Sequence, residues 1–131
     1  MAEKILVVDD EPAVAAVMAD ALREAGYEPD TRTDSVAALS LLSAIAYDLI
    51  VSDIAMPGLT GIQLLTLIKA QTPSPAVILI TGFSTRELAR SALEHGAFAY
   101  VEKPFDTADL VERAKQALWK RRLSQTSKQK T

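Results

Sequence analysis

Five times along this chain, a short run of apolar residues is followed by a segment whose apolar residues recur at helical spacing. The expected strands are residues 4–8, 27–32, 48–53, 76–80 and 98–101. This alternation is typical of strand–helix units that build a parallel sheet, and it does not fit an array of identical repeats. A chain of 131 residues is long enough for one domain with a real core and too short for two.

Two of these segments indicate the order of the strands. Pro29 lies in the segment 27–32, which therefore belongs at a sheet edge, where a missing N–H is tolerated. The segment 48–53 is apolar on both faces apart from Ser52, as expected for a central strand covered by helices. With right-handed crossovers, we predict a doubly wound, flavodoxin-like α/β domain with strand order 2-1-3-4-5.

The helix boundaries follow from turn and capping residues. Pro12 suits the first turn of a helix that stops at Gly26, and one of residues 33–35 can cap the second helix. Further helices are expected from Gly61, over residues 84–94 and after Asp106. The buried face of the first helix is predicted to hold Val14, Val17, Met18, Ala21 and Leu22, and Val36 is expected on that of the second.

Charge is distributed unevenly along the chain. Residues 120–131 hold five of the 14 basic residues and none of the 17 acidic ones. We therefore expect a domain over residues 1–119 and a basic, polar tail or linker over 120–131. An acidic body makes direct nucleic-acid binding by this domain unexpected. Because no apolar run approaches bilayer-spanning length and no signal segment precedes the first strand, we expect a cytoplasmic protein without membrane contact.

The absence of cysteine and the presence of one histidine, His95, narrow the possible chemistry. Disulfides, thiolate nucleophiles, cysteine zinc sites and histidine metal clusters are excluded. His95 precedes Gly96 at an expected helix end, where it would interact with the terminal carbonyl groups.

Carboxylates end two strands that the predicted order makes neighbours. Asp9 and Asp10 follow the first strand, and Asp53 ends the third. Three like charges at one edge cannot all stay ionised without a counter-charge, so the arrangement implies either altered protonation or a bound divalent cation. Mg²⁺, held by carboxylates and a phosphate oxygen, fits these ligands best.

Two further side chains follow strands at the same edge, Thr81 after the fourth strand and Lys103 after the fifth. Asp53 could attack a phosphoryl group and become an aspartyl phosphate, while Asp10 and Asp9 hold Mg²⁺. The Lys103 ammonium and the Thr81 hydroxyl could each contact a phosphoryl oxygen. Each residue alone is more often a cap, a turn or a solvated side chain, but their joint occurrence at four strand ends predicts a phosphoacceptor site.

With these residues in place, the chain resembles the receiver domain of two-component response regulators. The matching segments are residues 5–11, 48–61 with the turn Met56-Pro57-Gly58, 77–82 and 96–105. The resemblance implies that Asp53 accepts phosphate from a phosphohistidine of a histidine kinase or a histidine phosphotransfer protein, with Mg²⁺ required. It also implies that the backbone carbonyl of Ala55 binds the metal.

The resemblance further implies a switch rather than a turnover enzyme. Thr81 and Tyr100 would form its switch pair, and Lys103-Pro104 its lysine–proline pair, often joined by a cis bond. The surface of the fourth helix, fifth strand and fifth helix would then contact a downstream effector or a second copy of the chain. Because Ala55 and Phe83 cannot orient a water by hydrogen bonding, we expect slow autodephosphorylation.

Three alternatives use the same architecture. A phosphohydrolase of the haloacid dehalogenase type would need a second aspartate, as general acid, where this chain has Ala55. A flavin or nucleotide carrier would need glycines and hydroxyls in the first strand–helix turn, which reads Asp9-Asp10-Glu11-Pro12. A docking module that is never phosphorylated would be expected to lack some of the acids, Thr81 or Lys103, and none is missing.

Overall fold

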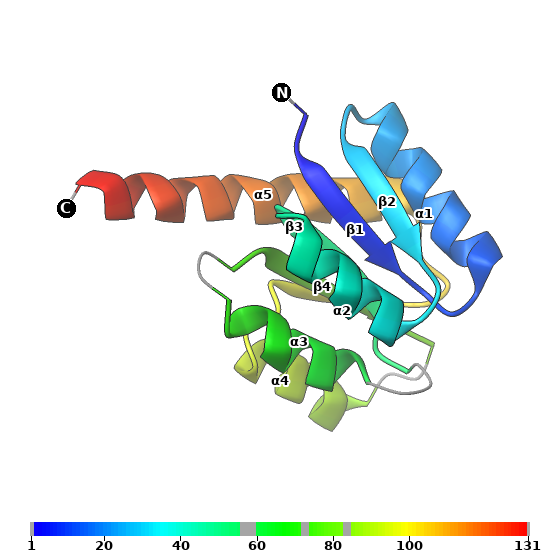
Figure 1. Ribbon diagram of the computed structural model, residues 1–131. Coiled ribbons are helices and arrows are strands. Elements are labelled where there is room, and N and C mark those ends of the chain that lie inside the picture. The colour runs from blue at the N-terminus through cyan, green and yellow to red at the C-terminus, as the bar shows by residue number, and fades with distance from the viewer. Residues whose placement is uncertain (1, 56–59, 72–73, 83–84, 131) are drawn as a thin grey trace.

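The sheet consists of five parallel strands in the order β2-β1-β3-β4-β5, which confirms the predicted topology. The computed structural model describes residues 2–55, 60–71, 74–82 and 85–130. The strands are β1 (Lys4–Val8), β2 (Glu28–Arg32), β3 (Leu49–Asp53), β4 (Ala76–Thr81) and β5 (Ala99–Glu102), and the helices are α1 (Pro12–Glu24), α2 (Ser35–Ala44), α3 (Gly61–Lys69), α4 (Arg86–Glu94) and α5 (Thr107–Lys130). Strands and helices alternate along the chain (Figure 1), so helical crossovers join the parallel strands.

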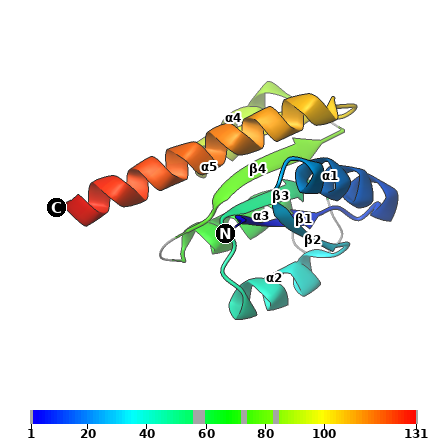
Figure 2. The ribbon, with the colours of Figure 1, turned by 90° about the horizontal axis from the view of Figure 1, so that it is seen from above.

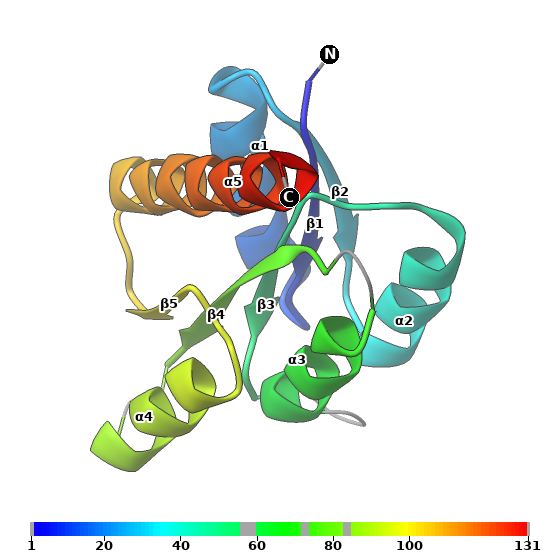
Figure 3. The ribbon, with the colours of Figure 1, turned by 90° about the vertical axis from the view of Figure 1, so that its left-hand side faces the viewer.

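Helices cover both faces of the sheet. Helices α1 and α5 lie on one face, and α2, α3 and α4 lie on the other (Figure 3). Alternate residues of the central strands divide between the two layers: Val51 packs toward α1 and α5, whereas Ile50 packs toward α2 and α3. This division explains why β3 is apolar at nearly every position, since a parallel strand covered on both sides has no solvent-facing row.

Capping residues set several helix ends. The Asp34 side chain accepts a hydrogen bond from the Ala37 N–H at 2.7 Å, so Asp34 is the cap among the three candidates for α2. Gly26 follows α1 with a φ of +100°, a conformation that favours glycine. Helix α4 is capped by Thr85 and begins at Arg86; the expected start at Ser84 lies outside the described residues.

The predicted buried faces of α1 and α2 were wrong at two positions. Val17 is 52% exposed and Val36 is 64% exposed. The residues that α1 buries are Ala15, Met18, Ala19 and Leu22. These four residues have the spacing i, i+3, i+4 and i+7 of one helix face, and Val17 lies outside that face.

Helix α5 continues well beyond residue 119, where the sequence suggests a boundary. Arg121 anchors this continuation to the body: its Nη1 lies 3.0 Å from Asp48 Oδ1, and its Nε donates to the Ser74 carbonyl at 3.2 Å. The last turns then leave the body (Figures 1 and 2). The division of the chain at residue 119 therefore stays a prediction. Among the described residues, none of the helices combines the length and apolarity needed to cross a bilayer.

Candidate functional site

Three carboxylates meet at the carboxyl edge of the sheet. Strands β1 and β3 pair with Val8 opposite Ser52, so Asp9 and Asp53 follow at the same level. One oxygen from each of Asp9, Asp10 and Asp53 lies within 4.8 Å of the others. Asp9 is 0% and Asp53 5% exposed, whereas Asp10 is exposed. The prediction that these three carboxylates meet at one edge of the sheet is therefore confirmed.

Lys103 supplies the positive charge that this cluster needs. Its Nζ lies 2.8 Å from Asp53 Oδ2, 3.0 Å from Asp9 Oδ2 and 3.6 Å from Glu11 Oε1. Lys103 follows β5, where its backbone N–H donates to the Thr81 carbonyl at 2.7 Å, and its peptide bond to Pro104 is cis. The contact with Glu11 was not predicted, although Glu11 directly follows the two aspartates in the sequence.

The protonation of Lys103 follows from this environment. Burial alone lowers the pKa of the ammonium, but the contacts with Asp53 and Asp9 outweigh burial and raise its pKa above the ordinary value. Lys103 therefore carries its full charge near neutral pH. The sequence left two explanations for how the three carboxylates can lie together: altered protonation or a bound divalent cation. The structure adds a third, because the Lys103 ammonium is an internal counter-charge.

Each buried carboxylate is held by the backbone through one oxygen. Asp53 Oδ1 accepts from the Ala55 N–H at 2.9 Å, and Asp9 Oδ1 accepts from the Glu11 N–H at 2.9 Å. The second oxygen of each faces Lys103. Asp9 Oδ2 is buried and makes no hydrogen bond in the part of the chain that is described, despite the nearby ammonium. That oxygen has acceptor capacity left for a cation.

The structure places the remaining predicted residues on β4, on β5 and in the segment after β3. Thr81 ends β4 and is fully buried; its strand neighbours are β3 and β5. Tyr100, on β5, is partly buried and packs against the layer that contains α2, α3 and α4. Ala55 is exposed next to Asp53. Phe83 and the turn Met56-Pro57-Gly58 lie outside the described residues.

His95 and Trp119 do not belong to this site. His95 ends α4, and its Nδ1 lies 2.7 Å from the Ser91 carbonyl oxygen, which confirms a helix-terminal role. Trp119 lies on α5 and is largely exposed, with the Arg122 guanidinium 5.6 Å from its ring centroid.

Comparison with known proteins agrees with the architecture. The family model for the response regulator receiver domain matches residues 5–115. The nitrogen assimilation regulatory protein NtrX of Azorhizobium caulinodans is 39% identical over 136 residues, an alignment that covers 100% of this chain and 30% of that protein. The DNA-binding transcriptional regulator NtrC of Escherichia coli K12 is 40% identical over 113 residues, covering 84% of this chain and 24% of that protein. The chain thus spans less than a third of the length of these relatives.

Solved structures show the same fold. The crystal structure of NtrX from Brucella abortus has a TM-score of 0.92 and 36% identity, covering 100% of this chain and 30% of that one. The beryllofluoride-activated NtrC4 receiver domain dimer has a TM-score of 0.86 and 32% identity, covering 90% of this chain and 98% of that one. From its sequence and its fold, the chain belongs to the family of response regulator receiver domains.

Proposed function

We propose that this domain accepts a phosphoryl group on Asp53 from the phosphohistidine of a histidine kinase or a histidine phosphotransfer protein, in a reaction that requires Mg²⁺. One observation carries the proposal: a buried aspartate at a strand end lies beside two further carboxylates and a lysine ammonium. The family assignment supports the same chemistry, because receiver domains are the switch domains of response regulators.

The residues present fit a magnesium ion. Asp9, Asp10 and Asp53 offer carboxylate oxygens within 4.8 Å of one another, and the backbone carbonyl of Ala55 would complete the set supplied by the protein. Carboxylate and carbonyl oxygens are the ligands that Mg²⁺ prefers, and Asp9 Oδ2 is buried without a hydrogen bond. When bound, Mg²⁺ would shield the charge of an incoming phosphoryl group from the resident acids.

The chain itself supplies the nucleophile and the groups that position the phosphate. A carboxylate oxygen of Asp53 attacks phosphorus, so that an O–P bond forms and the N–P bond to the donor imidazole breaks. The electron pair of that bond stays on the imidazole nitrogen, which takes a proton from solvent. The Lys103 ammonium, already 2.8 Å from Asp53, pairs with one phosphoryl oxygen, and the Thr81 hydroxyl donates to another.

Phosphorylation then shifts an equilibrium between inactive and active conformations. Thr81 moves toward the phosphoryl group and the Tyr100 ring turns inward, which changes the surface of α4, β5 and α5. A downstream effector or a second copy of the chain binds this surface. The domain makes no direct contact with nucleic acid or membrane, and it acts in the cytoplasm. It loses its phosphate slowly because neither Ala55 nor Phe83 can orient a water by hydrogen bonding.

Labelling with a small phosphodonor tests the phosphoacceptor. The chain is incubated with acetyl phosphate and Mg²⁺, and its intact mass is measured. We expect the mass of one phosphoryl group to be added to the wild type and to Asp20→Ala, which removes an exposed aspartate of α1, but not to Asp53→Ala. Equal labelling of Asp53→Ala would refute the assignment.

Two further measurements separate the proposal from its alternatives. Sustained release of nitrophenol from p-nitrophenyl phosphate would indicate a phosphohydrolase, whereas a receiver shows no sustained turnover. Size-exclusion chromatography with Mg²⁺ and beryllofluoride reports whether activation pairs two copies of the chain.

A further inference from the structure

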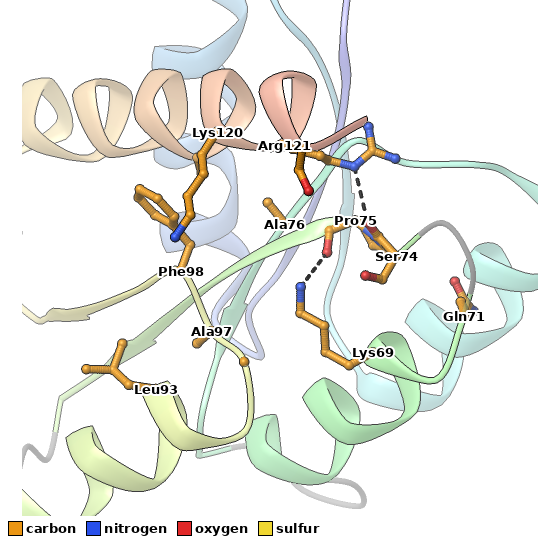
Figure 4. A pocket seen from close by; sticks show the side chains of 13 residues that line it. Lys69, Gln71, Ser74, Pro75, Ala76, Leu93, Ala97, Phe98, Lys120 and Arg121 are labelled. Atoms are coloured by element: carbon orange, nitrogen blue, oxygen red, sulfur yellow. Dashed lines mark hydrogen bonds between the residues drawn. The ribbon is translucent and has the colours of Figure 1, made fainter. Parts of the chain in front are cut away.

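A hollow of about 610 Å³ lies at the end of the sheet where β4 and β5 begin. The aspartates lie at the other end, where the strands finish. It is formed where α3 and α4 end, where β4 and β5 begin, and along α5 (Figure 4). Sites for small molecules commonly measure about 300–1,000 Å³. The hollow is therefore large enough for a ligand and is separated from the phosphoacceptor site by the length of the strands.

The charged residues that line this hollow are all basic. Lys69 comes from α3, and Lys120 and Arg121 come from α5; no aspartate or glutamate is among the described lining residues. Arg121 is paired with Asp48 at 3.0 Å, outside the lining. No ion pair between a carboxylate and either lysine is found in the described part of the chain. This concentration of positive charge contrasts with the acidic body around it.

Lys69 is held in position for a ligand. Its Nζ donates to the Pro75 carbonyl at 3.0 Å, and its side chain lies against Gly96, where an added Cβ would sit 3.4 Å from Lys69 Cγ. Burial, with the nearby charge of Arg121, lowers the pKa of the ammonium. An anion would relieve this repulsion, and little side-chain freedom remains to be lost when it binds.

Lys120 approaches the same space from the other side. Its Nζ lies 5.7 Å from the centroid of the Phe98 ring, and Figure 4 shows the side chain descending from α5 while that of Lys69 rises from α3. Leu93 and Ala97 add apolar surface, and Ser74, Ser124 and Gln71 add polar groups. The hollow is thus lined by the ammonium groups of Lys69 and Lys120, by hydrogen-bonding side chains and by the aromatic ring of Phe98.

We propose that this hollow binds a small organic phosphate, with phosphoryl oxygens on Lys69 and Lys120 and an apolar or planar part against Phe98. A phosphate suits the site better than a single carboxylate because two ammonium groups face the space, and neither forms an ion pair with a carboxylate among the described residues. The site differs in place and chemistry from the aspartate cluster, which repels anions until a cation is bound.

Amide NMR shifts during titration of the full chain test this proposal. Pyrophosphate and then ATP are added in the presence of EDTA, so that divalent cations cannot bring phosphate to the aspartates. We expect saturable shifts at Ala76, Ala97 and Phe98. We expect Lys69→Gln and Lys120→Gln to weaken binding by about three- to tenfold each, the effect of losing one ordinary hydrogen bond.

A matched control distinguishes a site from general attraction. Lys115→Gln removes the same charge from an exposed position of α5 outside the hollow, and it should change the affinity less than about twofold. Phe98→Leu should weaken ATP more than pyrophosphate. If Lys69→Gln unfolds the chain, Lys120→Gln carries the test, since Lys120 is exposed.

Three results would overturn the proposal. The first is the absence of saturable shifts at millimolar pyrophosphate and ATP. The second is a set of shifts confined to the edge around Asp53. The third is equal weakening by Lys120→Gln and Lys115→Gln, which would show that the anions respond only to net charge.

Discussion

Replacing Lys103 with methionine tests whether the aspartate cluster depends on an internal counter-charge. The substitution keeps an unbranched side chain of similar length and removes only the ammonium. Asp9 and Asp53 would then face each other without the cation that lies 3.0 and 2.8 Å from their oxygens. We expect the variant to be destabilised when no divalent cation is present, and to recover when Mg²⁺ is added.

The burial of the partners sets the expected magnitude. The side chains of Asp9, Asp53 and Lys103 are 0%, 7% and 17% exposed. Removing one partner of a buried ion pair costs about 3–5 kcal/mol, and we take the lower end, about 3 kcal/mol, because the cluster lies at a sheet edge. Magnesium at one hundred times its dissociation constant contributes about 2.7 kcal/mol, so it should restore most of the loss.

Urea unfolding followed by circular dichroism measures this effect in EDTA and in saturating Mg²⁺. Lys115→Met is the matched control, because it removes an exposed lysine of α5 that takes no part in the ion pairs of Lys103 with Asp9, Glu11 and Asp53. The variant Lys103→Met should also bind Mg²⁺ more tightly than the wild type in calorimetric titration, since no ammonium competes for the carboxylates. Wild-type stability of Lys103→Met in EDTA, or failure of Mg²⁺ to restore it, would refute the reasoning.

Three further predictions concern pH, phosphate lifetime and a helix cap. Because the pKa of Lys103 is raised above its ordinary 10.5, its stabilisation is complete below that pH and is lost as the pH rises through the folded-state value. The difference in unfolding free energy between the wild type and Lys103→Met should therefore be constant from about pH 7 to about pH 10 and shrink above that. Ala55→Asn should speed loss of the phosphoryl group, timed by mass spectrometry after the donor is removed; unchanged or slower loss would contradict the role given to Ala55. Asp34→Ala should lower the free energy of unfolding by about 1 kcal/mol and Asp34→Asn by much less, and equal losses would show that the side-chain cap does not matter.

Several elements of the fold could be predicted because their causes are local. Pro29 cannot donate within a ladder, so it requires an edge strand, and β2 lies at the edge. The strand that ends at Asp53 is apolar on both faces, which requires a central position between helices. Together these constraints order the strands, and that order brings Asp9, Asp10 and Asp53 to one edge without any knowledge of side-chain contacts.

Other features depend on packing that no short segment encodes. Val17 fits the periodicity of one possible apolar stripe, yet it is 52% exposed because tertiary packing turns another stripe, Ala15, Met18, Ala19 and Leu22, toward the sheet. Helix α5 continues past residue 119, and there Arg121 contacts Asp48 and Ser74, which lie far away in the sequence. The basic hollow likewise joins segments from α3, α4, β4, β5 and α5.

The amino-acid sequence alone determined the kind of sheet, its strand order and the acids that share its carboxyl edge, since propensity, periodicity and the geometry of parallel crossovers act through near neighbours. Only the tertiary structure decided which positive charge offsets part of the negative charge of those acids. Lys103 lies 50 residues from Asp53, and its ammonium contacts both Asp9 and Asp53 because strand register and burial place the three groups in one poorly solvated corner. Electrostatic energies there depend on distances of a few ångströms, and those distances exist only once the chain has folded.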